Sequence, residues 1–290
     1  MPTNTTKIPR PMVVIGAQKA GTATLSADLF CCDGFEIDLV RKEESELLTL
    51  NRSVQINNRT LERFTPKQTG KVVVDVSTLY STFPEHTVPL QQIAKLLPEM
   101  KIVYILRHPL QRTLSHHRQD TLIGVSTLSA EEAITPGSTY LENSLYGKQL
   151  SLWTKHFPVE NIMLIKFEDY ISDRIGTVRR ICAFSGVTDQ GCDSIQPNQA
   201  LNVTANRPKF HPWIHRILSS KIYHQYVRKK VPSDIRNKFK TSVSLPNDSK
   251  KGVISETKLK ELNNIFISDR DLLNSLHTNA PSWDLTDSRK

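Results

Sequence analysis

Four short, largely apolar runs constrain the fold of this 290-residue chain more than any other feature. They are rich in β-branched residues, continuous rather than alternating, and lie at residues 12–15, 72–76, 102–106 and 162–165. Such runs are typical of strands buried on both faces of a parallel sheet. Helical patterns fall among them, at residues 22–30, 88–97, 110–122, 145–156 and 172–184. The alternation predicts an α/β fold in which helices flank a parallel sheet.

Beyond residue 188 the chain is rich in Asn, Pro and Gln, with helical patterns at 223–239 and 256–276. No repeat or composition shift marks a domain boundary. We therefore expect a single domain over residues 1–290, with an α/β core at 11–187 and a loop-rich, helical C-terminal extension at 188–290.

Composition excludes several classes of protein. The apolar content of 38% and charged content of 23% are those of a folded globular chain rather than a disordered one. No window approaches the roughly 18 consecutive apolar residues of a membrane span, and the polar residues 1–11 lack the apolar stretch of a secretion signal. We expect a cytoplasmic protein that does not bind membranes.

The chain has 38 basic and 29 acidic residues, which give a net charge of +9. This excess suggests an anionic partner, such as an acidic glycan or a phosphorylated cofactor, although a solvated basic face explains it equally well. The basic runs at 228–230 and 250–251 are short and no aromatic platform interleaves with them, so we expect no nucleic-acid partner.

Four cysteines occur, at positions 31, 32, 182 and 192. No C-x-x-C pair or zinc-type spacing is present, and the adjacent Cys31 and Cys32 cannot bridge one another without strain. We expect reduced thiols, as in a cytosolic protein.

The first predicted strand runs into a turn bounded by Gly16 and Gly21, and a helix follows at once. The unpaired N–H groups of a helix start attract anions, and Lys19 adds a positive charge. The two glycines have P-loop spacing, but Thr22 stands where a nucleotide kinase has its lysine. An ordinary strand-to-helix turn is the alternative. The candidate anion-binding residues are Gln18, Lys19, Ala20, Gly21, Thr22, Ala23 and Thr24.

A second basic segment follows the third predicted strand. Arg107 ends the strand, Pro109 suits the first turn of the next helix, and Arg112 and Ser115 share a face of that helix. Parallel sheets bind ligands at the carboxyl ends of their strands, which would place Lys19 and Arg107 on one rim. An arginine fork and a hydroxyl suit a terminal phosphate, although a helix cap with two surface arginines is the alternative.

Together, residues 16–22 (GAQKAGT) and 107–115 (RHPLQRTLS) resemble the corresponding segments of PAPS-dependent sulfotransferases. Segments within 144–169 and the loop 202–204 resemble the bacterial enzymes related to the heparan sulfate sulfotransferases. The resemblance covers most of residues 11–285 and implies the P-loop-NTPase-like sulfotransferase fold.

The resemblance also implies the ligand. The first segment would bind the 5′-phosphosulfate of 3′-phosphoadenosine 5′-phosphosulfate (PAPS), where Lys19 would stabilise the leaving phosphate and Lys42 would assist as a second lysine. Arg107 and Ser115 would bind the 3′-phosphate, and Lys251 would lie over it in a basic-glycine loop. The product would be adenosine 3′,5′-bisphosphate. We expect no metal, because a sulfuryl group carries less charge than a phosphoryl group and no carboxylate cluster has ligand spacing.

In that family a glutamate in a K-E-x-x-F-F-like segment often acts as the general base. The matching segment here is 41–48, where leucines replace the aromatic pair. Alignment on Leu47 and Leu48 makes Glu44 the base, whereas alignment on the preceding Lys-Glu pair makes it Glu43. A solvated, charged helix start is the alternative for both glutamates.

Several other residues near these segments need an assignment. Asp75, Ser77 and Tyr80 resemble the family's D/E-x-S/T-P-x-Y segment with the proline missing, and we expect Asp75 to order the Lys19 loop or the acceptor site. Three histidines are alternative bases, but we expect them to shape the phosphate pocket, support Ser115 or face solvent. They are His108, His116 and His117.

The sequence therefore predicts an enzyme that transfers a sulfuryl group from PAPS to a hydroxyl or amine, on a glycan or a small natural product. A Mg²⁺-dependent P-loop kinase and a non-catalytic polyanion binder are the alternatives. The sequence indicates neither the acceptor nor the oligomeric state.

Overall fold

The structure is a computed structural model and describes residues 10–37, 62, 64–196 and 254–285. Five parallel strands form one sheet in the order β2-β3-β1-β4-β5. They are β1 (Met12–Gly16), β2 (Phe35–Ile37), β3 (Val72–Val76), β4 (Lys101–Leu106) and β5 (Ile162–Lys166). All four predicted runs form strands, so the predicted parallel sheet is confirmed. The sequence analysis missed β2, because three residues with a central glutamate give no apolar run.

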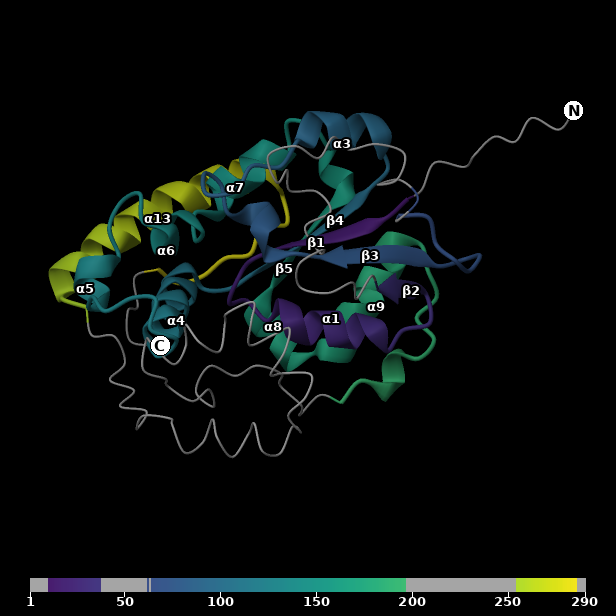
Figure 1. The fold of residues 1–290 in the computed structure, drawn as a ribbon, viewed down its shortest axis with the longest axis horizontal. Helices are drawn as coiled ribbons and strands as arrows, with labels where there is room; N and C mark the ends of the chain where they lie inside the picture. The colour runs from purple at the N-terminus through teal and green to yellow at the C-terminus, as the bar shows by residue number, and fades with distance from the viewer. Residues whose placement is uncertain (1–9, 38–61, 63, 197–253, 286–290) are drawn as a thin grey trace, which may run out of the picture.

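Helices cover both faces of this sheet (Figure 1). The longer ones are α1 (Thr22–Phe30), α3 (Leu90–Leu96), α4 (Pro109–Leu122), α7 (Tyr146–Trp153), α8 (Phe167–Ser172), α9 (Arg174–Ser185) and α13 (Glu256–Leu276). The short ones are η1 (Thr78–Ser81), α5 (Ala130–Ala133), α6 (Thr139–Glu142), η2 (Val159–Asn161) and η3 (Cys192–Ser194). Helices α1, α8 and α9 lie on one side of the sheet, and α3, α7 and α13 lie on the other.

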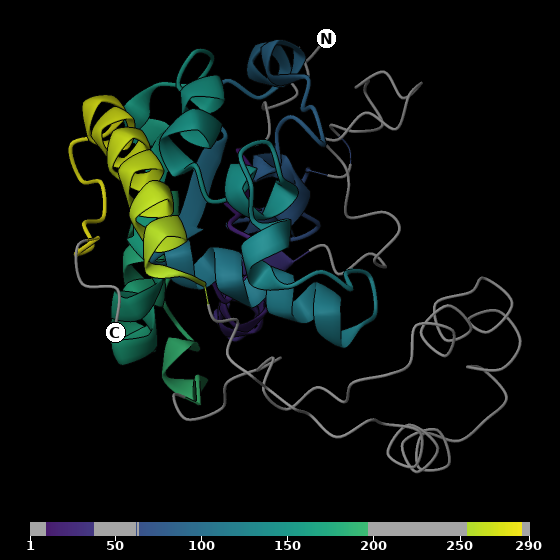
Figure 2. The same cartoon turned by 90° about the vertical axis from the view of Figure 1, so that its left-hand side faces the viewer.

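The C-terminal helix α13 packs along α7 on the outside of the molecule, as Figure 2 shows (α13 in yellow). Its observed bounds match the predicted helix at 256–276. The predicted helix at 223–239 lies outside the described residues, and the division into core and extension stays a prediction. Every helix in the described part of the chain is too short or too polar to cross a lipid bilayer.

Strand β1 lies at the centre of the sheet, and all five of its residues are buried. Its Val13 lies in register with Asp75 of β3 on one side and Ile102 of β4 on the other. The chain leaves β1 toward β2 and β3 but leaves β4 toward β5 on the opposite side. The carboxyl ends of β1 and β4 therefore form a topological switch point, which is where open α/β sheets bind ligands.

The expectation of four reduced thiols is wrong for Cys32 and Cys192, which the structure joins in a disulfide. These residues are 160 positions apart, and the fold brings their Cα atoms to 4.9 Å. Such a pairing depends on how the end of α1 packs near η3, which cysteine spacing does not reveal. Cys31 and Cys182 are free.

Candidate active site

The turn after β1 carries the first set of predicted residues to the switch point. Gly16 and Gly21 have φ angles of 139° and 81°, which glycine adopts at little cost. Lys19 has a φ of 73°, which is uncommon for a residue with a side chain. Ala17 N–H donates to Ile105 O at 2.7 Å and fastens the turn to the end of β4.

Helix α1 begins directly from this turn. Its N-cap is Gly21, which provides no side-chain hydrogen bond to the helix. Helix geometry gives the N–H groups of Thr22 and Ala23 no partner within α1, so the start of α1 can attract an anion. A Cβ at Gly21 would lie 2.7 Å from the Phe167 ring, so this turn also needs glycine for close packing.

Lys19 connects the turn to α4 through its side chain and to the junction between β4 and α4 through its backbone. Its Nζ donates to Oε1 of Gln119 at 2.6 Å. Its carbonyl oxygen accepts a hydrogen bond from Nη1 of Arg107 at 3.4 Å. The structure therefore brings together the two segments that the sequence analysis placed on one rim.

Arg107 is held where β4 passes into α4. Its guanidinium lies 5.3 Å from the centre of the Phe167 ring, and its carbonyl accepts from the Tyr146 hydroxyl at 2.8 Å. Burial lowers the pKa of the guanidinium from its ordinary value. Glu168 accepts from the N–H of His108, the N-cap of α4, at 3.0 Å and from Nε1 of Trp283 at 3.1 Å. The junction is thus supported from three other segments of the chain.

Helix α4 places Ser115 and Arg112 in different environments. Ser115 is half-buried, one turn before Gln119 and thus on the same face. Arg112 is fully buried and donates to Tyr140 O at 2.8 Å and to His116 Nδ1 at 3.1 Å. Burial lowers its pKa to about 10. Arg112 and Ser115 are therefore three residues apart on α4, as predicted, but only Ser115 is partly exposed to solvent.

Each of the three histidines considered as alternative bases contacts another residue of the chain. His117 is buried, with Nε2 3.0 Å from Leu128 O. His116 is buried beside Arg112, and burial, followed by the charges of Arg112 and Lys19, lowers its pKa to about 3. His108 Nε2 lies 3.3 Å from Asp284 O.

The segment after β3 forms a compact turn beside the Lys19 loop. Asp75 is buried and accepts a hydrogen bond from the Tyr80 hydroxyl. Ser77 caps η1 by accepting from the N–H of Leu79, so the turn forms without the family's proline. A Cβ at Gly16 would collide with the hydroxyl of Ser81, which shows how closely η1 approaches the loop.

Comparison with known proteins identifies the family. A sequence profile described as the sulfotransferase family matches residues 35–191, more than half of the chain. The chain belongs to the sulfotransferase family. The profile match includes Arg107 and Ser115 but begins after the Lys19 loop, whose assignment therefore depends on its geometry.

Individual relatives of this chain are distant. Heparan sulfate glucosamine 3-O-sulfotransferase 3A1 of Mus musculus is 24% identical over 139 residues, 44% of this chain and 33% of that protein. Heparan sulfate glucosamine 3-O-sulfotransferase 6 of Homo sapiens is 25% identical over 105 residues, 33% of this chain and 31% of that protein. The matches thus span about a third of these curated relatives. A crystal structure of a sulfotransferase from Alicyclobacillus acidocaldarius aligns with a TM-score of 0.57 and 19% identity, over 94% of this chain and 97% of that one. This alignment confirms the predicted fold.

Several predicted site residues of this chain lie outside the described residues. They are Lys42, Glu43, Glu44, the loop 202–204 and Lys251. Their roles stay predictions.

The structure adds residues that the sequence analysis did not select. Gln119 contacts Lys19, and Phe167, Glu168, Tyr146 and Trp283 support the Arg107 junction. Phe167 and Glu168 lie within a segment that resembles the family, and this resemblance could have identified them as site residues. Nothing in the local sequence indicates the contact between Lys19 and Gln119.

Two cavities in the described part of the chain lie away from the Lys19 loop. One of about 840 Å³ follows β5 and the segment 277–282, and one of about 450 Å³ lies between η1, α3 and α7. Neither is lined by Lys19, Arg107 or Ser115. The candidate site is therefore defined by its hydrogen bonds and its position at the switch point.

Proposed function

We propose that this chain transfers a sulfuryl group from PAPS to a hydroxyl or amine of an acceptor. The observation that carries the proposal is the contact between Arg107 Nη1 and Lys19 O at the switch point between β1 and β4. This contact joins the loop that precedes a helix start and carries a lysine to the strand end that carries the arginine. Their proximity supports a nucleotide with phosphate at both ends as the ligand.

The Lys19 loop would bind the 5′-phosphosulfate. The N–H groups of residues 20–23 and the hydroxyls of Thr22 and Thr24 would contact its oxygens, together with Gln18. In the transfer the acceptor oxygen or nitrogen bonds to sulfur while the bond from sulfur to the 5′-phosphate oxygen breaks. Negative charge grows on that oxygen, and the Lys19 ammonium is positioned to stabilise it. The left-handed conformation of Lys19 supports a loop shaped for a ligand.

The 3′-phosphate would lie against α4. Arg107 offers a planar fork of N–H donors and Ser115 a hydroxyl, which together suit a terminal phosphate. Lys251 would add a second cation there. Adenosine 3′,5′-bisphosphate leaves as the product.

The acceptor must lose a proton, and we propose that a glutamate of the segment 41–48 accepts it as the general base. Glu44 is the preferred base and Glu43 the alternative, while Lys42 would contact the transferred group. Asp75, held by Tyr80 beside the loop, would position the loop or the acceptor. We assign no metal to the reaction, so transfer should continue in EDTA.

Two acceptor classes fit this proposal. The names of the matched relatives specify a glucosamine of heparan sulfate, and the net charge of +9 suits an anionic glycan. A small hydroxylated or amino natural product is the second class. Thr22 in the lysine position of a P-loop counts against the kinase alternative.

A labelled-donor assay tests the proposal. Full-length chain is incubated with ³⁵S-labelled PAPS and EDTA, against panels of oligosaccharides and small hydroxylated metabolites. We expect label transfer to one class, a loss of at least roughly 100-fold in Lys19→Ala, and wild-type transfer in Lys260→Ala, which changes an exposed lysine of α13. Glu44→Gln and Glu43→Gln, compared in the same assay, identify the base. Absence of transfer, together with no rise in melting temperature when adenosine 3′,5′-bisphosphate is added, would overturn the proposal.

A further inference from the structure

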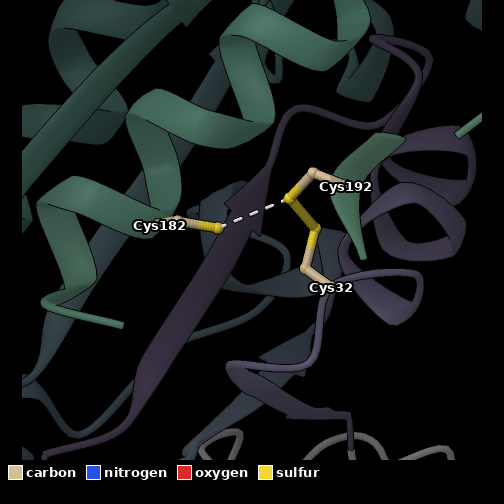
Figure 3. A group of neighbouring side chains, drawn as sticks. All are labelled: Cys32, Cys182 and Cys192. Carbon is tan, nitrogen blue, oxygen red and sulfur yellow. Dashed lines mark hydrogen bonds between the residues drawn. A yellow bond between two sulfur atoms is a disulfide. The ribbon is translucent and has the colours of Figure 1, made fainter. Parts of the chain in front are cut away.

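Three cysteine sulfurs lie together beside the end of α1 (Figure 3). Cys32 and Cys192 form the disulfide, and Cys182 of α9 points at it, with its Sγ 3.9 Å from Sγ of Cys192. All three sulfurs lie within 4.8 Å of one another. Cys31, by contrast, is partly exposed and donates its thiol to Ala27 O at 3.4 Å.

The cluster is buried in the core. The exposed fractions are 2% for Cys32, 1% for Cys182 and 0% for Cys192. Burial, followed by the negative charge of Asp189, raises the pKa of Cys182 to about 11. The third sulfur is therefore a neutral thiol in the folded chain at neutral pH.

This chemistry favours a redox site over a metal site. In the described part of the chain these cysteines are the only group of three or more residues that could share a metal ion. A divalent ion would need the cysteines as thiolates, which would leave a net negative charge in the core near Asp189. A disulfide beside a thiol is neutral and needs no such compensation.

We propose that Cys32, Cys182 and Cys192 form a thiol–disulfide exchange site in which Cys192 pairs with either of the other two. In the exchange the Cys182 thiol first loses its proton, and the resulting thiolate attacks Sγ of Cys192. The bond between Cys192 and Cys182 forms, the bond between Cys192 and Cys32 breaks, and Cys32 leaves as a thiolate that takes up the proton Cys182 gave up. No electrons are gained or lost, so the step needs no oxidant or reductant.

The two disulfide isomers constrain the chain differently. The bond from Cys32 to Cys192 closes a segment with a sequence separation of 160 and fastens α1 to η3. The bond from Cys182 to Cys192 spans only ten positions and leaves α1 untied. In the chain-entropy view the longer loop stabilises the fold more, so the second isomer should melt at a temperature lower by roughly 5 °C.

Disulfide mapping tests the site in the wild-type chain. The full-length protein is equilibrated in a buffer of reduced and oxidised glutathione, free thiols are alkylated in acid, and cross-linked peptides are identified by mass spectrometry. We expect the link between Cys32 and Cys192 as the main species and the link between Cys182 and Cys192 as a minor one. Detection of the first link alone, at every glutathione ratio, would overturn the proposal, as would a chain with three thiols holding a metal ion.

A variant isolates the second pairing. In Cys32→Ser, oxidised glutathione takes two electrons from Cys182 and Cys192 and becomes two molecules of reduced glutathione. We expect the link between Cys182 and Cys192 in the folded variant, and the wild-type pattern in the control Cys31→Ser. Persistence of both thiols in a Cys32→Ser chain that has a cooperative melting transition would overturn the proposal. If Cys32→Ser does not fold, the wild-type mapping decides.

Discussion

The ammonium of Lys19 donates to the side-chain oxygen of Gln119 at 2.6 Å, although the residues are 100 positions apart. An ammonium has three N–H donors, so this bond sets its direction without excluding a phosphate contact. Gln119 lies one turn beyond Ser115, on the same face of α4. The helix that carries the serine assigned to the 3′-phosphate therefore also directs the lysine assigned to the 5′-phosphate.

The first prediction tests this positioning. Gln119→Met removes the acceptor but keeps the length of the side chain. We expect kcat for sulfuryl transfer to fall about tenfold, because a misdirected ammonium stabilises the leaving oxygen less. The Kd for adenosine 3′,5′-bisphosphate should change much less. Equal kcat in wild type and variant would mean that the contact does not position Lys19.

The second prediction concerns Arg107. Arg107→Met removes the fork of donors at the end of β4 while keeping an apolar side chain against Phe167. We expect the Kd for adenosine 3′,5′-bisphosphate to rise roughly 100-fold, measured by titration calorimetry. The matched control is Arg270→Met on α13, where the arginine forms an ion pair with its neighbour Asp271. A similar loss in both variants would show general electrostatic attraction instead of a phosphate site.

The third prediction concerns a buried ion pair between α1 and α9. Asp28 accepts from Arg174 Nε at 2.8 Å and Nη2 at 2.5 Å, and from the Tyr170 hydroxyl at 2.6 Å. Asp28→Asn leaves the buried arginine without its counter-charge, so we expect the free energy of unfolding to drop by about 3–5 kcal/mol in urea titrations.

The control for this pair is Asp193→Asn. Its partner Arg179 and its own carboxylate are largely exposed, with side-chain exposed fractions of 46% and 82%. Water screens such a pair, so the expected loss is below about 1 kcal/mol. If the two variants lost equal stability, the buried pair would not hold α1 against α9.

The fourth prediction is a pH dependence of stability. The pKa of His116 is about 3 in the folded chain against an ordinary value of 6.5. Between these values the unfolded chain binds a proton that the folded chain does not, so His116 makes the fold less stable as pH falls.

His116→Asn keeps an acceptor for Arg112 but does not titrate. Relative to this variant, the wild-type free energy of unfolding should fall by about 2 kcal/mol between pH 7 and pH 5. Urea unfolding at the two pH values measures the difference. Parallel pH profiles for the two chains would show that His116 is protonated equally in both states.

Much of the fold could be predicted because local sequence determines it. Continuous β-branched runs identified four strands, and the bounds of α1 and α13 were predicted correctly. The boundary between α8 and α9 was not, because it depends on Asp173, whose carboxylate caps α9 through Gly176 N–H at 2.9 Å. The strand order was not predicted, since pairing between distant segments has no signature in one sequence.

The candidate site was likewise predicted only in part. The rule that parallel strands present ligands at their carboxyl ends predicted the proximity of Lys19 and Arg107. Gln119 was missed because its contact depends on the direction in which α4 crosses the loop. Cys32 and Cys192 were misassigned because only the packed fold brings them together.

We propose that the Lys19 loop and the Arg107–Ser115 element bind the two ends of one nucleotide. Calorimetric titration of the full-length chain with adenosine 3′,5′-bisphosphate, adenosine 5′-monophosphate and adenosine 3′-monophosphate tests it most directly. We predict that the bisphosphate binds at least roughly 100-fold more tightly than either monophosphate, because each phosphate contributes charge-assisted hydrogen bonds. Equal affinity for the bisphosphate and one of the monophosphates would show that the chain binds only one end of the nucleotide.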